Sequence, residues 1–185
     1  MQHIILIGLP GSGKTSAGQR LARRFCLPFV DADQVFEAQA GQSIASYFAQ
    51  YGEATFREQE TATLRKIIAA QEPCVLSTGG GVVLRAENRA LLKAGGIVVY
   101  LLAQPDAIYQ RLRNDTQRPL LQVADPRAKI NALFEERDAL YRETAHLVVE
   151  TGRNSLSAQV RKIAEALEQA GWVAGAGNAV LKMQQ

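Results

Sequence analysis

The chain has 185 residues, of which 47% are hydrophobic and 21% are charged, and its formal net charge is +3. These values are typical of one globular domain, which we expect over residues 1–173. No apolar run reaches the roughly 18 residues of a membrane span, and no basic cluster supports nucleic-acid binding. Cys26 and Cys74 lie far apart, which favours free buried thiols in a reducing compartment. Because the N-terminus lacks the pattern of a secretion signal, we expect a cytoplasmic protein.

The first specific pattern runs from Ile4 to Thr15. Residues 4–7 are all apolar and predict a buried strand, and a helical pattern follows over residues 16–25. The residues between them match G-x-x-x-x-G-K-[ST] without a mismatch: Gly8-Leu9-Pro10-Gly11-Ser12-Gly13-Lys14-Thr15. Strand, glycine loop and helix together indicate a phosphate-binding P-loop, whereas a plain glycine-rich turn would not require the Lys-Thr pair.

A P-loop binds a nucleoside triphosphate through its backbone N–H groups and the start of the following helix. Lys14 is expected to reach the β- and γ-phosphates as a catalytic cation, and the Thr15 hydroxyl to hold Mg²⁺. The predicted nucleotide contacts from this segment are Gly11, Ser12, Gly13, Lys14, Thr15 and Ser16.

The rest of the chain alternates strands and helices. Strands are predicted over residues 27–30, 73–77, 97–102 and 146–150, and helices over 35–40, 43–51, 53–70, 87–94, 107–113, from 126 onward, and 155–171. This alternation predicts a five-stranded parallel sheet with helices on both faces, which is a three-layer α/β/α sandwich like that of P-loop kinases. A polar segment around residues 112–125 is interpreted as a lid, and residues 174–185 as a C-terminal tail that shows no strong pattern and to which no role is assigned.

Two carboxylates stand at the end of the second predicted strand, where open parallel sheets bind ligands. Asp31 is expected to hold Mg²⁺ through water, and Asp33 to face the acceptor of the phosphoryl group. The alternatives are that Asp33 caps a helix and that Asp31 is a solvated strand end. No N-K-x-D motif is present in the sequence, which argues against a GTPase.

Arginines and glycines complete the candidate site. Arg57 shares a helix face with apolar residues, and Gly79-Gly80-Gly81 follows the third predicted strand, where either a ligand approach or a plain turn fits. Arg137 interrupts an apolar helix stripe, which is costly unless an ion pair or a bound substrate anion compensates its charge.

These motifs occur in the order and spacing of the shikimate kinases, and the resemblance covers residues 4–167. The motifs that carry it are Gly8–Thr15, Asp31-x-Asp33, Phe56-Arg57-x-x-Glu60, Gly79-Gly80-Gly81, Arg118-Pro119-Leu120-Leu121 and Arg137-x-x-x-Tyr141. The resemblance implies strand order 2-3-1-4-5, a monomer, and ATP- and Mg²⁺-dependent phosphorylation of the shikimate 3-hydroxyl. The product would be shikimate 3-phosphate, on the route to chorismate and the aromatic amino acids.

The resemblance also implies residue roles. Arg57 and Arg137 would bind the shikimate carboxylate, Asp33 would orient the attacking hydroxyl, and Gly79, Gly80 and Gly81 would line the same pocket. Arg118 would close with the lid onto ATP and the transferring phosphate, and Arg111 and Arg153 would flank the adenine. The rival hypotheses are a gluconate kinase, a non-catalytic nucleotide-binding protein and a nucleic-acid-binding P-loop protein.

Overall fold

The computed structural model describes residues 2–113, 123–151 and 155–172. Five parallel strands form one sheet in the order β2-β3-β1-β4-β5, which confirms the predicted topology. The strands are β1 (His3–Ile7), β2 (Phe29–Asp31), β3 (Val75–Ser77), β4 (Gly96–Leu102) and β5 (Leu147–Glu150). The helices are α1 (Lys14–Phe25), α2 (Ala32–Ala40), α3 (Ile44–Ile68), η1 (Val82–Leu84), α4 (Ala86–Gly95), α5 (Pro105–Leu112), α6 (Pro126–Thr144) and α7 (Leu156–Gln169).

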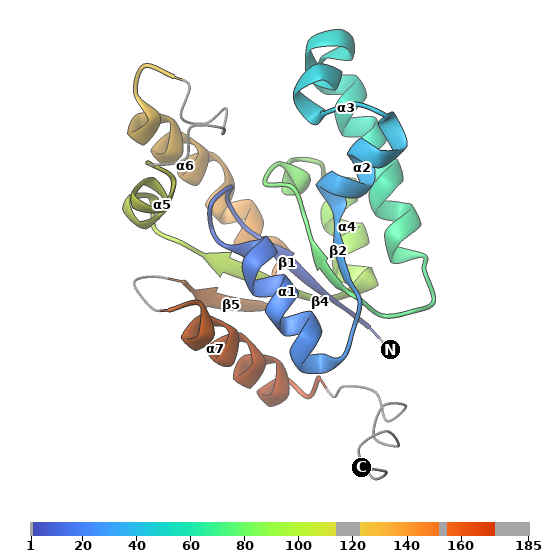
Figure 1. Ribbon diagram of the computed structural model, residues 1–185, viewed down its shortest axis with the longest axis vertical. Coiled ribbons are helices and arrows are strands. Elements are labelled where there is room, and N and C mark those ends of the chain that lie inside the picture. The colour runs from blue at the N-terminus through green and yellow to red at the C-terminus, as the bar shows by residue number, and fades with distance from the viewer. Residues whose placement is uncertain (1, 114–122, 152–154, 173–185) are drawn as a thin grey trace.

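Helices cover both faces of the sheet, so residues 4–7 of its central strand β1 are all apolar. Alternate β1 residues point to opposite faces, and Ile4, Ile5, Leu6 and Ile7 are all 0% exposed. One core lies between the sheet and helices α1 and α7, and a second lies between the sheet and helices α3 to α6. Figure 1 shows the resulting three layers, as the alternating pattern predicted.

The structure corrects several expected boundaries. The second strand begins at Phe29 rather than at residue 27, because Pro28 has no N–H group to donate to a ladder. The two helices expected over 43–51 and 53–70 are confirmed as two segments of α3 separated by a break at Gly52, with φ 78° and ψ 171°, but the second segment ends at Ile68 rather than at residue 70. Cys26 is exposed rather than buried, since it caps α1 in a left-handed conformation, whereas Cys74 is buried, and both are free thiols.

None of the described helices has the length and apolar composition that crossing a membrane requires. The predicted lid lies largely outside the described residues, as do residues 173–185 of the chain. Of the predicted lid region, the structure describes the two ends, which are the last turn of α5 and Asp125, the N-cap residue of α6.

Candidate active site

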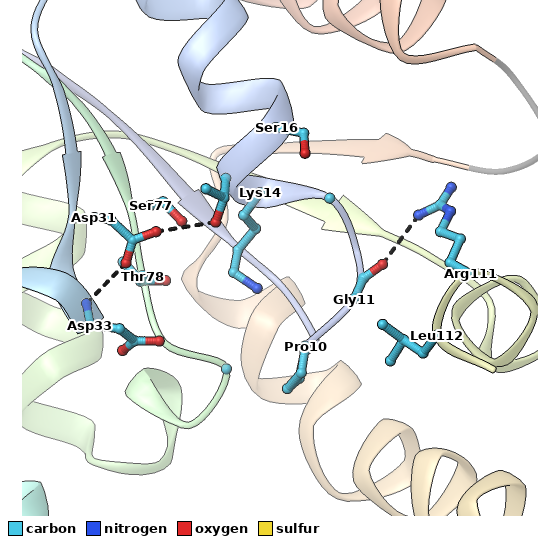
Figure 2. Close-up of a pocket in the computed structure, with 13 residues that line it drawn as sticks. Pro10, Gly11, Lys14, Ser16, Asp31, Asp33, Ser77, Thr78, Arg111 and Leu112 are labelled. Atoms are coloured by element: carbon cyan, nitrogen blue, oxygen red, sulfur yellow. Dashed lines mark hydrogen bonds between the residues drawn. The ribbon is translucent and has the colours of Figure 1, made fainter. Parts of the chain in front are cut away.

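The carboxyl ends of β1, β2 and β3 meet around one open cavity of about 360 Å³. The P-loop follows β1, Asp31 ends β2, and Ser77 and Thr78 lie at the end of β3. Figure 2 shows these groups facing the cavity from different sides, with Lys14 between the carboxylates and the Gly11–Arg111 contact. The lining residues are Pro10, Gly11, Gly13, Lys14, Thr15, Ser16, Asp31, Asp33, Ser77, Thr78, Gly80, Arg111 and Leu112.

The P-loop presents the N-terminus of α1 to this cavity. Gly13 is the N-cap residue and has φ 96°, a left-handed conformation that a side chain would strain. The Lys14 ammonium curls back over the loop and donates to the carbonyls of Gly8 at 2.8 Å and Leu9 at 3.0 Å. Helix N–H groups and a cation therefore face the same space, which is the arrangement that binds phosphate.

Asp31 connects the P-loop helix to α2. Its Oδ2 accepts from the Thr15 hydroxyl at 3.1 Å, and its Oδ1 accepts from the backbone N–H of Asp33 at 3.1 Å. Asp31 is therefore both the last, half-buried residue of β2 and the N-cap of α2, and the interpretation of Asp33 as the cap is wrong. The reason is that the chain turns into helix one residue after β2, which leaves Asp33 inside the first turn.

The oxygen atoms of Thr15 and Asp31 fit a magnesium ion. Both are hard ligands, they lie beside the predicted phosphate position, and they already contact each other. Among the residues that the structure describes, no cluster of three or more carboxylate, histidine or cysteine side chains forms a closed metal cage.

Asp33 is the carboxylate with the most perturbed ionisation. Burial, followed by the negative charge of Asp31, raises the pKa of Asp33 to about 6, and the Lys14 cation opposes this shift. Glu60 and Glu37 add smaller effects in the same direction as Asp31. A carboxylate with a pKa near the working pH is suited to accepting a proton from a hydroxyl group.

The three glycines after β3, here named the triglycine loop (Gly79, Gly80 and Gly81), pack tightly against different parts of the site. An alanine Cβ at position 79 would lie 2.8 Å from Oδ1 of Asp33, and one at position 80 would lie 2.6 Å from the ring of Pro10. At position 81 it would lie 2.5 Å from both terminal nitrogens of Arg57. These glycines are closely packed against the protein's own groups, which side chains here would displace, whereas their approach to a ligand stays a prediction.

Arg57 lies on α3, where acidic and aromatic side chains partly surround its guanidinium. Its guanidinium pairs with Glu60 at 2.9 Å and with Glu53 at 3.1 Å, and lies over the rings of Phe48 and Phe56. Only 16% of its side chain is exposed, which agrees with the sheltered face that the sequence predicted. Burial raises the pKa of Glu60, and the charge of Arg57 opposes this effect most strongly.

Arg137 approaches the same region from α6. Its charge and that of Arg57 both lower the pKa of Glu60, so the two guanidiniums act on one carboxylate. Arg137 Nε pairs with Glu136 at 3.2 Å, and its side chain is 13% exposed, whereas that of Glu136 is 52% exposed. An ion pair, which was one of the two alternatives that the sequence left open for Arg137, is therefore present. It does not by itself exclude that Arg137 also binds a second anion.

Arg111 anchors the far side of the P-loop. Its guanidinium donates to the carbonyls of Gly11 at 3.4 Å, Ser12 at 3.3 Å and Thr151 at 3.4 Å. Burial lowers the pKa of Arg111. The predicted residues Arg118 and Arg153 lie outside the described residues, so their placement stays a prediction.

Several residues of the site were not chosen from the sequence. Ser77 and Thr78 line the cavity, and their position at the end of a predicted strand was a usable signal. Glu60 lies three residues after Arg57, at the spacing of helix ion pairs, which was a second signal. The contact of Tyr141 with Gly80 spans 61 positions, and no local pattern announces it.

The comparisons with known proteins agree with one another. A family model for shikimate kinase matches residues 10–168 of this chain. The shikimate kinase of Burkholderia pseudomallei (strain K96243) is 48% identical over 172 residues, covering 93% of this chain and 93% of its own length. That of Paracidovorax citrulli (strain AAC00-1) is 50% identical over 171 residues, covering 91% of this chain and 93% of its own.

Solved structures give the same result. The shikimate kinase from Acinetobacter baumannii in complex with shikimate has a TM-score of 0.86 at 38% identity, covering 92% of this chain and 94% of that one. A gluconokinase from Sinorhizobium meliloti 1021 has a TM-score of 0.60 at 18% identity, covering 98% of this chain and 97% of that one. This lower likeness shows a shared fold alone. With its family model, its curated relatives and its solved neighbours in agreement, the chain belongs to the shikimate kinase family.

Proposed function

We propose that this protein transfers the γ-phosphoryl group of ATP to the 3-hydroxyl of shikimate, giving shikimate 3-phosphate and ADP. The observation that carries the proposal is the placement of Asp33, which lines the same cavity as the P-loop and touches the triglycine loop. A proton acceptor beside a phosphate cradle, with the charges of Arg57 and Arg137 both acting on the nearby Glu60, fits a small hydroxylated carboxylate. The Acinetobacter baumannii relative was solved with shikimate bound.

Each described residue has a role in this proposal. Lys14 and the N–H groups of Gly11 to Ser16 bind and neutralise the phosphates, because phosphoryl transfer depends mainly on positioning and charge. Asp33 orients the acceptor hydroxyl and takes its proton. The oxygens of Thr15 and, through water, Asp31 would hold Mg²⁺, which supplies charge neutralisation at the phosphates when bound.

The acceptor carboxylate lies between Arg57 and Arg137, since a planar guanidinium binds a carboxylate through two parallel hydrogen bonds. Backbone groups of the triglycine loop, Gly79 to Gly81, contact the ring. Arg118 closes onto ATP and the transferring phosphate with a lid over about residues 112–125, and lid closure excludes water. Arg111 and Arg153 flank the adenine.

The remaining features of the proposal concern the whole protein. Residues 1–173 act as a single kinase domain, and residues 174–185 form a tail outside it. The protein works as a cytoplasmic monomer on the route to chorismate and has no nucleic-acid partner. The mild net charge of +3, with no clustered basic run, supports the last point.

The test is ADP release in a coupled assay with Mg²⁺, with shikimate, gluconate or no acceptor. We expect turnover with shikimate only, and a loss of kcat of about 10²-fold or more in Asp33→Asn, because a general base contributes a factor of this size. Turnover with gluconate, or ADP release independent of the acceptor, would contradict the proposal. Asp33→Asn retaining full kcat with shikimate would contradict the role of Asp33 alone.

A further inference from the structure

Tyr141 joins two parts of the proposed acceptor pocket that come from distant segments of the chain. It lies on α6, it is 0% exposed, and its hydroxyl donates to the carbonyl of Gly80 at 2.5 Å. A fully buried hydroxyl must satisfy its hydrogen-bonding capacity inside the protein, because leaving it unpaired costs free energy. Here the hydroxyl donates its hydrogen to Gly80, the middle residue of the triglycine loop.

The same hydroxyl also contacts Arg137. Tyr141 follows Arg137 by four positions, so the two side chains lie on one face of α6, one turn apart. Burial raises the pKa of the Tyr141 hydroxyl, and the nearby positive charge of Arg137 opposes this shift. The phenol group therefore lies beside a guanidinium and donates to a carbonyl.

Arg57 borders the opposite side of the same loop. The Cα of Gly81 approaches Arg57 so closely that an added Cβ would lie 2.5 Å from its terminal nitrogens. Gly81 thus contacts Arg57, and its neighbour Gly80 accepts from Tyr141. The triglycine loop therefore connects Arg57 with Tyr141, which lies one helical turn from Arg137.

The Tyr141 ring is itself held in place. It stacks on Tyr100 of β4, with ring centroids 4.9 Å apart and an interplanar angle of 27°. The Tyr100 hydroxyl donates to Asp138 at 2.9 Å, the residue that follows Arg137 on α6. This stacking holds the Tyr141 ring against strand β4, so the phenol oxygen has a defined position.

We propose that Tyr141 is a positioning residue, which fixes the triglycine loop and Arg137 relative to each other so that Arg57 and Arg137 grip one acceptor carboxylate. This inference rests on the proposed function. It assigns to Tyr141 no contact with the reacting atoms. Removal of the hydroxyl should therefore weaken acceptor binding and leave the phosphoryl-transfer step and ATP binding unchanged.

The experiment compares Tyr141→Phe with the matched control Tyr100→Phe. Both changes remove one buried hydroxyl and keep the stacked rings, but the Tyr100 hydroxyl donates to Asp138 and not to the triglycine loop. For Tyr141→Phe we expect the KM for shikimate to rise about tenfold, the factor that one such hydrogen bond typically supplies. We expect kcat and the KM for ATP to stay within about twofold of the wild type in both variants.

A double-mutant cycle tests whether Tyr141 acts through Arg137. In an Arg137→Ala background, the addition of Tyr141→Phe should raise the KM for shikimate no further, since the group that it positions is gone. Calorimetric titration of shikimate in the cold provides the same comparison should Tyr141→Phe prove unstable at the assay temperature.

Three outcomes would overturn the inference: an unchanged KM for shikimate in Tyr141→Phe, an equal rise in both tyrosine variants, or fully additive effects in the cycle. The proposed function fails separately, because it fails when the wild-type protein shows no shikimate-dependent ADP release. That measurement precedes the variants, so the two failures are distinguished.

Discussion

At the scale of single residues, Asp33 links the fold to the chemistry through its ionisation. Its pKa is raised to about 6, chiefly by burial. Since the ionised form accepts the proton, we expect kcat/KM for shikimate to be constant at higher pH and to fall tenfold per unit below about pH 6. A pH profile of the wild-type protein measures this limb. An acidic limb near the ordinary value of 3.8 would contradict the raised pKa of Asp33.

The same ionisation predicts how stability depends on pH. Because the folded pKa of Asp33 lies above the 3.8 of an ordinary aspartate, its protonation stabilises the fold below about pH 4 and this stabilisation is lost as the pH rises through about 6. Asp33→Asn has no such loss, so it should gain on the order of 2–3 kcal/mol over the wild type between about pH 4 and pH 8. Urea unfolding at both pH values measures the gain. A constant difference between the two proteins would contradict the shifted pKa.

Replacement of Gly81 by alanine tests the binding of the acceptor without straining the backbone. Its φ of −93° and ψ of −1° suit any residue, so the effect of Gly81→Ala comes from the contact of the new Cβ with Arg57. The end of an arginine side chain can move, so we expect little change in stability but a rise of about tenfold or more in the KM for shikimate. Steady-state kinetics and thermal unfolding of the variant check both expectations.

Gly96→Ala is the contrasting control. Its Cβ would lie 2.2 Å from the backbone oxygen of His3, a contact between two strands that cannot yield. This variant should lose stability, and whatever folded enzyme remains should keep the wild-type KM. If Gly81→Ala instead lost stability and kept its KM, the packing of the triglycine loop against Arg57 would not serve substrate binding.

At the scale of elements, the break in α3 determines where the aromatic cage of Arg57 lies. Gly52 has φ 78° and ψ 171°, a region of backbone space that is essentially restricted to glycine. The break lets Phe48, before it, stack on Phe56, after it, with ring centroids 4.4 Å apart. We expect Gly52→Asn to cost about 1–3 kcal/mol of unfolding free energy, although no atom lies within 4 Å of the added Cβ.

Gly41→Asn is the matched control for this prediction. Gly41 also has open space around it, but its φ of 67° and ψ of 13° are left-handed helical values that asparagine tolerates. Denaturant unfolding should therefore show a clearly smaller loss for Gly41→Asn. Equal losses in the two variants would mean that the break in α3 is not held by the backbone preference of glycine.

Elements were predictable where a local pattern carries the signal. Four consecutive apolar residues give β1, and the P-loop motif places Lys14 and Thr15 without reference to the rest of the chain. The first residue of β2 was missed because its start depends on pairing with β3, which lies more than 40 positions away. Likewise, Asp31 rather than Asp33 caps α2 because α2 begins at Ala32, three residues before the expected start at residue 35.

The candidate site was predictable in its residue types but not in its contacts. The glycines at 79–81 suggested an approach to a ligand, whereas their packing against Pro10 and Arg57 depends on how the P-loop and α3 meet. The sequence pattern also did not predict the ion pair of Arg137 with its neighbour Glu136, because a bound substrate anion would compensate the charge of Arg137 equally well. Such contacts arise from tertiary structure, which local periodicity does not encode.

At the scale of the whole molecule, the two ends of the sheet have different tasks. The carboxyl ends of β1, β2 and β3 carry the P-loop, Asp31 and Ser77, as is usual for ligand sites in open parallel sheets. At the amino end of the sheet, two histidine rings accept hydrogen bonds from backbone N–H groups in place of strand-to-strand hydrogen bonds. His3 Nδ1 accepts from the N–H of Cys74 at 3.1 Å, and His146 Nδ1 accepts from the N–H of Val98 at 3.0 Å.

This division predicts that His3→Ala lowers stability without affecting catalysis. Because Nδ1 of His3 accepts, Nε2 carries the proton and donates to the carbonyl of Ile68 at 3.3 Å, so the ring ties β1 to β3 and to the end of α3. His3 is only 4% exposed, and its loss leaves the Cys74 N–H without this acceptor, at a cost of about 1–3 kcal/mol. Urea unfolding should show this loss while kcat and both KM values stay at wild-type levels. A change in kcat for folded His3→Ala would mean that the amino end of the sheet is coupled to the site.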